Sequence, residues 1–218
     1  MNEIINNISN RSRNQILNAL ENGVKGDFVG NEIDPSTHIK KEQNPLDEIK
    51  LKMSENKFIV SEVDGISQVY GEINKIASSY NCSSLIYPEG LSIDINKIDA
   101  KKKTCFNKSI EELRDEVFDS DFSIIDAAFG ISSHGIACVI SSKNQPRMLS
   151  LAPMLCIMLL DKTKIESSLF SGLSKIKADF NELPTNIMYI AGPSRTSDIE
   201  LVTVFGVHGS QKVHIIFY

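Results

Sequence analysis

The sequence lacks the features that would place it in a membrane or on nucleic acid. No apolar run reaches the roughly 18 residues that a membrane-spanning helix needs. The polar start MNEIINNISNRSRNQ has no apolar stretch of the kind found in secretory signals. Acidic residues outnumber basic ones by 28 to 23, which gives a net charge of −5 and argues against a concentrated basic face. We therefore expect a cytoplasmic protein that binds no nucleic acid.

Cysteine and histidine are too few and too scattered for a recognisable metal site. The four cysteines show no C-x-x-C or similar ligand spacing. Cys138 and Cys156 lie inside apolar runs, where a reduced thiol packs as a small hydrophobe. Of the four histidines, His214 lies in the last apolar run and is expected to pack or to face solvent. The sequence predicts that the chain itself holds no metal and no iron–sulfur cluster.

The glycine-rich phosphate loops of common nucleotide enzymes are also missing. Neither G-x-G-x-x-G nor G-x-x-x-x-G-K-[ST] occurs, which argues against the usual dinucleotide and nucleoside-triphosphate enzymes. One short basic run, Lys101 to Lys103, is interpreted as a solvated loop.

What the sequence does contain is an alternation of β-forming runs and helical patterns. Several runs are too apolar to be half-solvated, so they predict an α/β fold with a central, largely parallel sheet and helices on both faces. The strands are predicted over 57–63, 83–89, 122–131, 135–141, 154–161, 186–192 and 212–218, and the helices over 69–77, 109–118 and 166–180. The helix over 109–118 opens with a Ser-x-x-Glu capping box.

The first quarter of the chain differs from the rest. Apolar residues at helical spacing run over residues 3–22, and a polar stretch without periodicity follows. Asn44 and Pro45 then fit the N-cap and first turn of a short helix. We therefore predict an amino-terminal helical arm with its linker over residues 1–53 and an α/β domain over residues 54–218.

The first candidate site is AGPSRTSDIE, residues 191–200, which follows the predicted strand NIMYI. A Gly-Pro pair breaks the strand, and Ser197 with Glu200 matches a capping box that predicts a helix over 198–205. The N–H groups of a helix start, with hydroxyls and a guanidinium just upstream, form a cradle for a carboxylate or phosphate at the carboxyl end of a strand. Alternatively, the two residues only cap the helix, and Arg195 only pairs with an acid.

Two histidines among small residues are further candidates. His208 stands in GVHG, residues 206–209, where the imidazole can project as a proton shuttle or serve the turn alone. His134 follows two serines in FGISSHG, residues 129–135, which fits either a nucleophile with its base or a plain turn between strands. Arg147, just ahead of an apolar strand, fits an anion clamp or a surface turn.

The carboxyl-terminal segment resembles a known family. Residues 191–218 match the pattern Gly-Pro-Ser-Arg-Thr-x-Asp-Ile-Glu, then Gly-Val-His-Gly and a short apolar strand, which is similar to the closing signature of the LUD-domain family of lactate-utilisation protein C (YkgG-type) proteins. QPRMLSLAP and SRNQILNAL are similar to further family segments. The resemblance implies a fold like that of the CoA-transferase and sugar-phosphate-isomerase superfamily. It also implies a role in oxidising L-lactate to pyruvate with two partner proteins, where a partner subunit carries the iron–sulfur cluster and the electron transport.

The resemblance further implies a set of site residues. Where the family more usually reads Gly-Ile-Ala-Glu-Thr-Gly-Thr, this chain has Ser133 in place of the Glu and His134 in place of the first Thr. If that Glu is a catalytic acid, this chain lacks it. Catalytic roles fall on Glu200, Asp198 and His208, and ligand binding falls on Gly192, Ser194, Arg195, Thr196, Gly209, His134, Gly135 and Arg147.

Three hypotheses follow for the function. In the first, the chain is a ligand-binding subunit of a lactate-oxidation system, with Arg195 as the anion clamp and Ser194 and Thr196 as hydrogen-bond donors. In the second, it is a stand-alone enzyme of the isomerase or CoA-transferase type that acts on a small anion, with Glu200 or Asp198 as base or nucleophile. In the third, it is an assembly module whose helical arm docks a partner.

Overall fold

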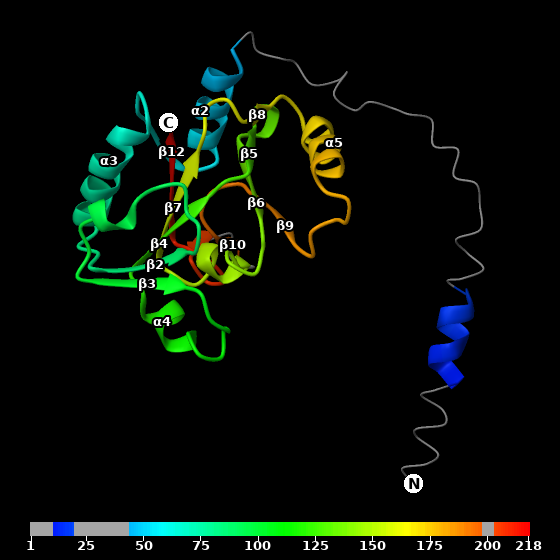
Figure 1. Cartoon of the computed structure of the whole chain (residues 1–218). Helices are drawn as coiled ribbons and strands as arrows, with labels where there is room; N and C mark the ends of the chain where they lie inside the picture. The colour runs from blue at the N-terminus through cyan, green and yellow to red at the C-terminus, as the bar shows by residue number, and fades with distance from the viewer. Residues whose placement is uncertain (1–10, 20–43, 198–202) are drawn as a thin grey trace. The chain divides into compact units, whose positions relative to one another are not determined.

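The computed structural model describes residues 11–19, 44–197 and 203–218. Residues 11–19 form a helix, within the span predicted for the first helix. The remaining described residues form an α/β unit (Figure 1). Its helices are α2 (Pro45–Glu55), α3 (Ile66–Ser79), α4 (Arg114–Asp119) and α5 (Leu169–Asp179). Its strands are β1 (Ile59–Glu62), β2 (Ser84–Pro88), β3 (Lys102–Phe106), β4 (Phe122–Asp126), β5 (Phe129–Ile131), β6 (Ile136–Ile140), β7 (Leu155–Leu160), β8 (Ile165–Glu166), β9 (Ile187–Ile190), β10 (Arg195–Ser197), β11 (Thr203–Phe205) and β12 (Lys212–Phe217).

The central sheet has six strands in the order β1-β12-β7-β4-β2-β3, and every neighbouring pair is parallel. This confirms the predicted parallel sheet. A second, four-stranded sheet has the order β8-β5-β6-β9, and β10 with β11 forms an antiparallel hairpin. The chain therefore carries a parallel core and a smaller mixed sheet beside it.

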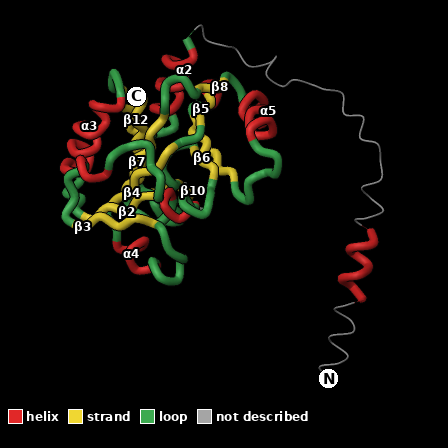
Figure 2. The backbone as a smooth tube through the Cα atoms, viewed as in Figure 1, coloured by secondary structure: helices red, strands yellow, loops and turns green. Residues whose placement is uncertain are grey.

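The apolar runs are continuous because both faces of the central sheet are covered. All six residues of β7 are buried. Cys156 and Met158 belong to the same core cluster as residues of α2, whereas Ile157 and Leu159 pack in the cluster of α3. Because side chains alternate between the faces of a strand, such a strand needs apolar residues at every position. Figure 2 shows strands at the centre with helices on either side, as predicted.

The run predicted as one strand over 122–131 is two strands in two sheets. The amide of Ala127 donates to the carbonyl of Leu159 at 2.9 Å, and the next amide, that of Ala128, donates to Cys138 at 2.8 Å. Consecutive backbone groups thus bond to different sheets, so the chain leaves the central sheet between these two alanines. Both halves are equally apolar because α5 covers the second sheet, where Phe129 packs in one cluster with Ile176.

Helix α2 belongs to the α/β unit. The side chain of Asn44 accepts a hydrogen bond from the Leu46 amide at 3.1 Å and caps the helix as predicted. Ile49 and Met53 are fully buried in the main core cluster. The predicted boundary after residue 53 therefore cuts through a core helix, and the α/β unit includes α2. Residues 1–10 and 20–43 of the predicted arm lie outside the described residues.

Strand β3 corrects the interpretation of the basic run as a loop. Lys102 and Lys103 are exposed, as expected, but they lie on a strand at the edge of the sheet. Lysines on an edge strand disfavour pairing with another chain. The capping contact of Ser109 with Glu112 forms at 3.2 Å, but a turn follows it and α4 begins only at Arg114.

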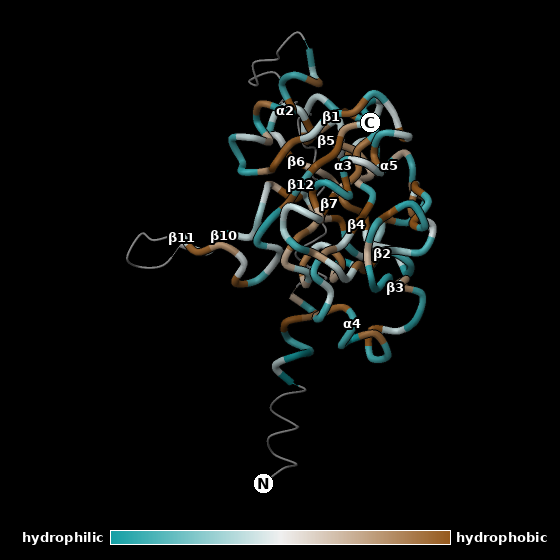
Figure 3. The backbone as a smooth tube through the Cα atoms, turned by 90° about the vertical axis from the view of Figure 1, so that its left-hand side faces the viewer, coloured by the Kyte–Doolittle hydropathy of each residue, from teal (hydrophilic) through white to brown (hydrophobic). Residues whose placement is uncertain are grey.

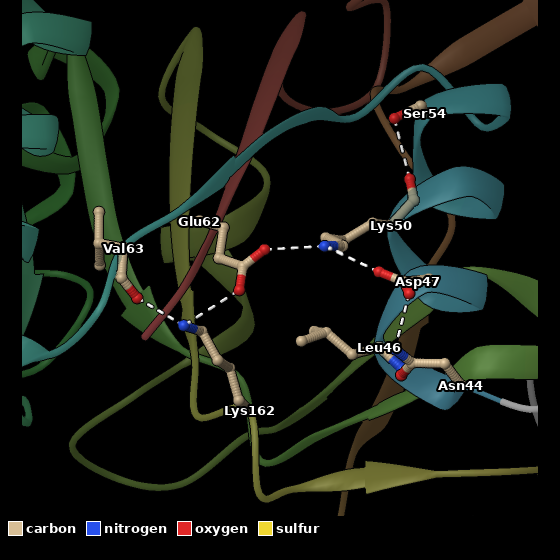
Figure 4. Close-up of polar contacts among 8 residues, drawn as sticks. All are labelled: Asn44, Leu46, Asp47, Lys50, Ser54, Glu62, Val63 and Lys162. Atoms are coloured by element: carbon tan, nitrogen blue, oxygen red, sulfur yellow. Dashed lines mark hydrogen bonds and ion pairs between the residues drawn. The ribbon is translucent and has the colours of Figure 1, made fainter.

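A chain of ion pairs fixes α2 to the carboxyl end of β1 (Figure 4). The ammonium of Lys50 lies 3.1 Å from Asp47 and 2.8 Å from Glu62. The other oxygen of Glu62 lies 3.2 Å from Lys162, which also donates to the carbonyl of Val63 at 2.6 Å. These hydrogen bonds, first from Lys50 and then from Lys162, lower the pKa of Glu62. The network joins α2, β1 and the turn after β7.

At the amino ends of the parallel strands, Asp121 joins the start of β4 to the start of β2. We expect Asp121→Asn to lower the free energy of unfolding by about 1 kcal/mol. One carboxylate oxygen accepts from the amides of Ser83 at 2.7 Å and Ser84 at 2.8 Å. Burial opposes ionisation, but these amides outweigh it and lower the pKa of Asp121. Urea unfolding at neutral pH checks the loss. Asp119→Asn, on an exposed residue at the end of α4, is the control, and an equal loss in both variants would contradict the prediction.

Candidate functional site

The candidate loop connects the two sheets. It leaves β9 in the small sheet at Ile190, two residues before the end of the strand predicted over 186–192, and enters β12 in the central sheet at Lys212. It therefore lies at the amino edge of the parallel sheet, and not at the carboxyl edge as expected from the sequence. Figure 3 shows its hairpin, β10 and β11, extending from the body of the domain.

The prediction of a helix over 198–205 is wrong. Thr203–Phe205 is a strand that pairs with Arg195–Ser197, with Thr196 opposite Val204. The β-branched side chains of these two residues favour this cross-strand pairing over a helix. Ser197, the expected cap, lies in β10, whereas Asp198 and Glu200 lie outside the described residues.

The base of the hairpin is tied to the central sheet through backbone groups. Ser194 donates its amide to the carbonyl of Ser210 at 3.0 Å and accepts from Gly206 at 3.0 Å. The buried hydroxyl of Ser210 lies within hydrogen-bonding distance of two carbonyl oxygens, that of Ser150 at 3.1 Å and that of Pro153 at 2.8 Å. A side chain on Gly209 would crowd Ser194. Ser210 and these carbonyls fix where the hairpin starts.

Asn56, at the C-cap of α2, brings two predicted segments together. Gly192 has a φ of +92° and lies so close to the carbonyl of Asn56 that a Cβ atom would overlap it. The amide of the Asn56 side chain donates to the carbonyls of His134 at 2.8 Å and Gly135 at 2.9 Å. The two candidate segments therefore meet at one asparagine, which sequence reasoning missed because its partners are distant along the chain.

The segment FGISSHG contains the 3-10 turn η3 (Ser132–His134), which packs directly on α2. Gly135 ends the turn in the left-handed region, with φ of +60°. A Cβ there would overlap backbone atoms of Lys52 and Met53. The Ser133 hydroxyl lies 2.7 Å from Nδ1 of His134, so the two side chains are within hydrogen-bonding distance.

A nearly buried ion pair supports the same turn. Glu48 is 5% exposed, and its carboxylate lies 2.7 Å from the ammonium of Lys52, which also donates to the carbonyl of Ser133 at 3.0 Å. Burial opposes ionisation of Glu48, but the hydrogen bond and charge of Lys52 outweigh it, so the pKa of Glu48 lies below its ordinary value. The pair holds η3 against the last turns of α2.

The predicted polar side chains are unevenly placed. Arg195 is exposed and donates to the carbonyl of Ala191 at 3.0 Å, within its own loop. His208 and His134 are also exposed. Arg147 is exposed at the start of the 3-10 turn η4 (Arg147–Ser150), and no described contact joins its side chain to the 192–196 loop.

A cleft of about 390 Å³ opens beside the hairpin. The hairpin loop contributes Pro193 and Phe205, and Lys57 and Lys212, at the starts of β1 and β12, also line the cleft. Lys57 has a φ of +72° because it follows the C-cap of α2, where the amides of Lys57 and Phe58 donate to the carbonyls of Ser54 and Met53 and close the helix. The remaining lining residues are Ser54, Phe58, Ile59, Gln211 and Val213. A cleft with apolar walls and two cations suits a small carboxylate.

The profile of the LUD domain family matches residues 46–218. The chain belongs to the LUD domain family. The match begins inside α2, in agreement with the burial of that helix. In the described parts of this LUD domain, no helix has the length and apolar character needed to cross a membrane. Over the same residues, no three His, Cys, Asp or Glu side chains gather in a way that could hold a metal ion.

Relatives of this LUD domain include proteins named for lactate use. The uncharacterized protein NMB1437 of Neisseria meningitidis is 33% identical over 51% of this chain and 48% of its own length. The uncharacterized protein YkgG of Escherichia coli is 36% identical over 41% of this chain and 40% of its own. Lactate utilization protein C of Bacillus licheniformis is 35% identical over 38% of this chain and 35% of its own. The matching segments thus span less than half of each relative.

A solved structure shares the fold of this LUD domain. A DUF162 family protein from Deinococcus radiodurans superimposes with a TM-score of 0.60, over 79% of this chain and 95% of that chain, at 18% identity. At this identity the likeness shows the α/β fold alone.

Proposed function

We propose that this LUD domain serves in L-lactate utilisation as a subunit that binds a small carboxylate at the amino-edge cleft. The observation that carries the proposal is the cleft beside the hairpin, with Lys57 and Lys212 in its lining. Relatives named lactate utilization protein C support the carboxylate as lactate or pyruvate. In the proposal, partner subunits hold the iron–sulfur cluster and take the electrons.

In the proposal, Arg195 of the hairpin supplies a third cation for the same ligand. The described contacts of Arg195 use its Nη2 atom, which donates to the carbonyl of Ala191. A guanidinium has five N–H donors in a planar fork, so its remaining donors can receive a carboxylate. In the proposal, Arg195 closes over the ligand, while Ser194 and Thr196 supply donors at the base of the hairpin and His208 lies beside it.

We expect Arg195→Ala to weaken binding of lactate or pyruvate about tenfold, because an exposed charge-assisted pair contributes modestly. Isothermal titration calorimetry on the full chain measures the affinity, and a thermal-shift screen with lactate, pyruvate, phosphate, sugar phosphates and CoA esters tests the ligand class. Arg114→Ala removes an equal charge from exposed α4 and is the control. Unchanged affinity in a folded Arg195 variant rejects the clamp.

If no carboxylate binds the wild type, the assembly role gains weight, and co-purification with partner subunits tests it.

A stand-alone enzyme of the isomerase or CoA-transferase type is the second candidate. It is favoured by the 2.7 Å contact between the Ser133 hydroxyl and Nδ1 of His134, which is within reach for a nucleophile and its base. Glu200 and Asp198 remain its predicted acid–base residues. This function requires turnover by the isolated chain that is lost in Ser133→Ala or Glu200→Gln.

A further inference from the structure

The strand order creates a second place for a ligand, at the carboxyl edge of the central sheet. From β2 the chain moves outward to β3, then returns past β2 to β4 and continues to β7. The connections on the two sides of β2 and β4 therefore run in opposite directions. In open α/β sheets, ligands bind outside the carboxyl ends of the strands at such a reversal. The proposed lactate site lies at the other edge.

A cleft of about 540 Å³ lies at this edge, beside the carboxyl end of β2. It is built from the ends of three segments: the residue after β2, the end of β3 with the turn that follows, and the turn after β6. Its lining residues are Glu89, Phe106, Asn107, Lys108, Ser109, Ile110, Ser142, Lys143, Asn144 and Pro146. Its volume lies in the range of about 300–1,000 Å³ that is typical of small-molecule sites.

The turn after β6 is fastened to the end of β4. The side chain of Gln145 accepts from the amide of Asp126 at 3.1 Å and donates to its carbonyl at 3.0 Å. The Gln145 backbone exchanges two further hydrogen bonds with Ser142, both at 3.0 Å. These four bonds place Lys143 and Asn144 at the tip of a fixed turn on the cleft wall.

The charges of the cleft fit a dianion. Lys108 and Lys143 are both exposed, and neither has an ion-pair partner within 4.0 Å among the described residues. Glu89 is the one acid in the lining, so the cleft keeps a net positive charge. A phosphate monoester carries a charge of about −1.5 to −2 at neutral pH. Asparagine amides and serine hydroxyls in the lining supply further donors to its oxygens.

The apolar residues of the lining fit an apolar body attached to that phosphate. Phe106 is buried at the end of β3, and Ile110 and Pro146 complete an apolar surface. A bare phosphate ion fills little of the volume and leaves this surface in water. We propose that the carboxyl-edge cleft binds an organic phosphate whose body is apolar or planar, with Lys108 and Lys143 on the phosphate and Phe106 under the body.

Calorimetric titration of the full chain with phenyl phosphate tests this assignment. We expect binding with a Kd below about 1 mM, and binding at least about tenfold weaker in the Lys108→Ala, Lys143→Ala double variant. A second double variant, Lys101→Ala with Lys177→Ala, removes the same charge from exposed positions outside the cleft and should bind as wild type. Circular dichroism verifies that both variants fold.

Inorganic phosphate and phenol separate the two halves of the ligand, because the first carries the charge alone and the second the apolar body alone. Each should bind at least about tenfold more weakly than phenyl phosphate, since each makes one half of the contacts. Equal binding of either probe, equal affinity in both double variants, or no binding of phenyl phosphate up to about 10 mM overturns the assignment. Arg195→Ala should leave phenyl phosphate binding unchanged, so this result is independent of the lactate site.

Discussion

Replacing Gly135 with alanine is expected to lower the free energy of unfolding by about 2–5 kcal/mol, because two costs add at this position. An L side chain in the left-handed region costs about 1–2 kcal/mol. The new methyl group would also overlap backbone atoms of Lys52 and Met53, and forcing packed elements apart costs about 1–3 kcal/mol. The backbone of a helix cannot rotate away as a side chain can, so α2 must move as a whole.

Gly90→Ala is the matched control for Gly135→Ala. Gly90 also has a positive φ, of +80°, but a Cβ there would meet no atom within 4 Å. It should therefore show the conformational cost alone, about 1–2 kcal/mol. Urea unfolding of the two variants in one buffer measures the difference. Equal losses would contradict the close contact between η3 and α2 as a constraint on the fold.

Strand β7 and Gly135 show why the fold could be predicted from the sequence, whereas the contact between η3 and α2 could not. The six buried residues of β7 reveal themselves as an apolar run, because burial on both faces of a sheet leaves a local pattern. The contact of Gly135 with α2 leaves none, since its partner residues lie more than 80 positions earlier and follow an ordinary helical pattern. A turn of glycine, serine and histidine has the same sequence pattern whether or not a helix packs against it, so the pattern does not predict the contact.

The hairpin marks a second limit, where a local signal pointed the wrong way. Ser197 and Glu200 match a capping box, but Thr196 pairs across the hairpin with Val204. A capping box is worth about 1 kcal/mol, which tertiary pairing and β-branched side chains readily outweigh. The wrong helix prediction also affected the candidate site. The predicted anion cradle depended on the free N–H groups of a helix start, and this segment forms a hairpin instead.

The clefts were beyond sequence reasoning for a related reason. Lys57 and Lys212 lie at the starts of β1 and β12, which are neighbours in the sheet but far apart in the chain. Lys108 and Lys143 likewise come from turns after different strands. Parallel strand order decides which turns meet, and the sequence predicted a parallel sheet without its order.

His214 should make stability depend on pH in a window where few other groups titrate. It lies in β12 with 5% exposure, its Nε2 atom is 3.1 Å from the Tyr80 hydroxyl, and the two rings meet edge to face. This confirms the packing role that was one of two expectations. Burial lowers the pKa of His214 from 6.5 to about 4; Glu72 opposes this shift, and Lys212 adds to it.

A folded-state pKa below the unfolded value means that the unfolded chain takes up the proton first as the pH falls. Stability is therefore complete above pH 6.5 and is lost as the pH falls toward 4. The linkage gives a loss of about 2 kcal/mol between pH 7 and pH 5 and about 3 kcal/mol in all. Urea unfolding at pH 7, 6 and 5 measures it, and His214→Gln, which keeps a polar partner for Tyr80, should remove that part of the slope.

The variant comparison separates His214 from the carboxylates. Glu62, Glu72 and Asp121 have lowered pKa values, so their stabilisation is lost only below about pH 4.5. Asp126 has a pKa raised by burial and acts in the opposite direction, but equally in wild type and variant. His208→Gln, at an exposed position, should keep the wild-type slope. If the pH slope persists unchanged in His214→Gln, the folded chain accepts a charge at this position. That result would contradict the burial of His214 between β12 and the end of α3.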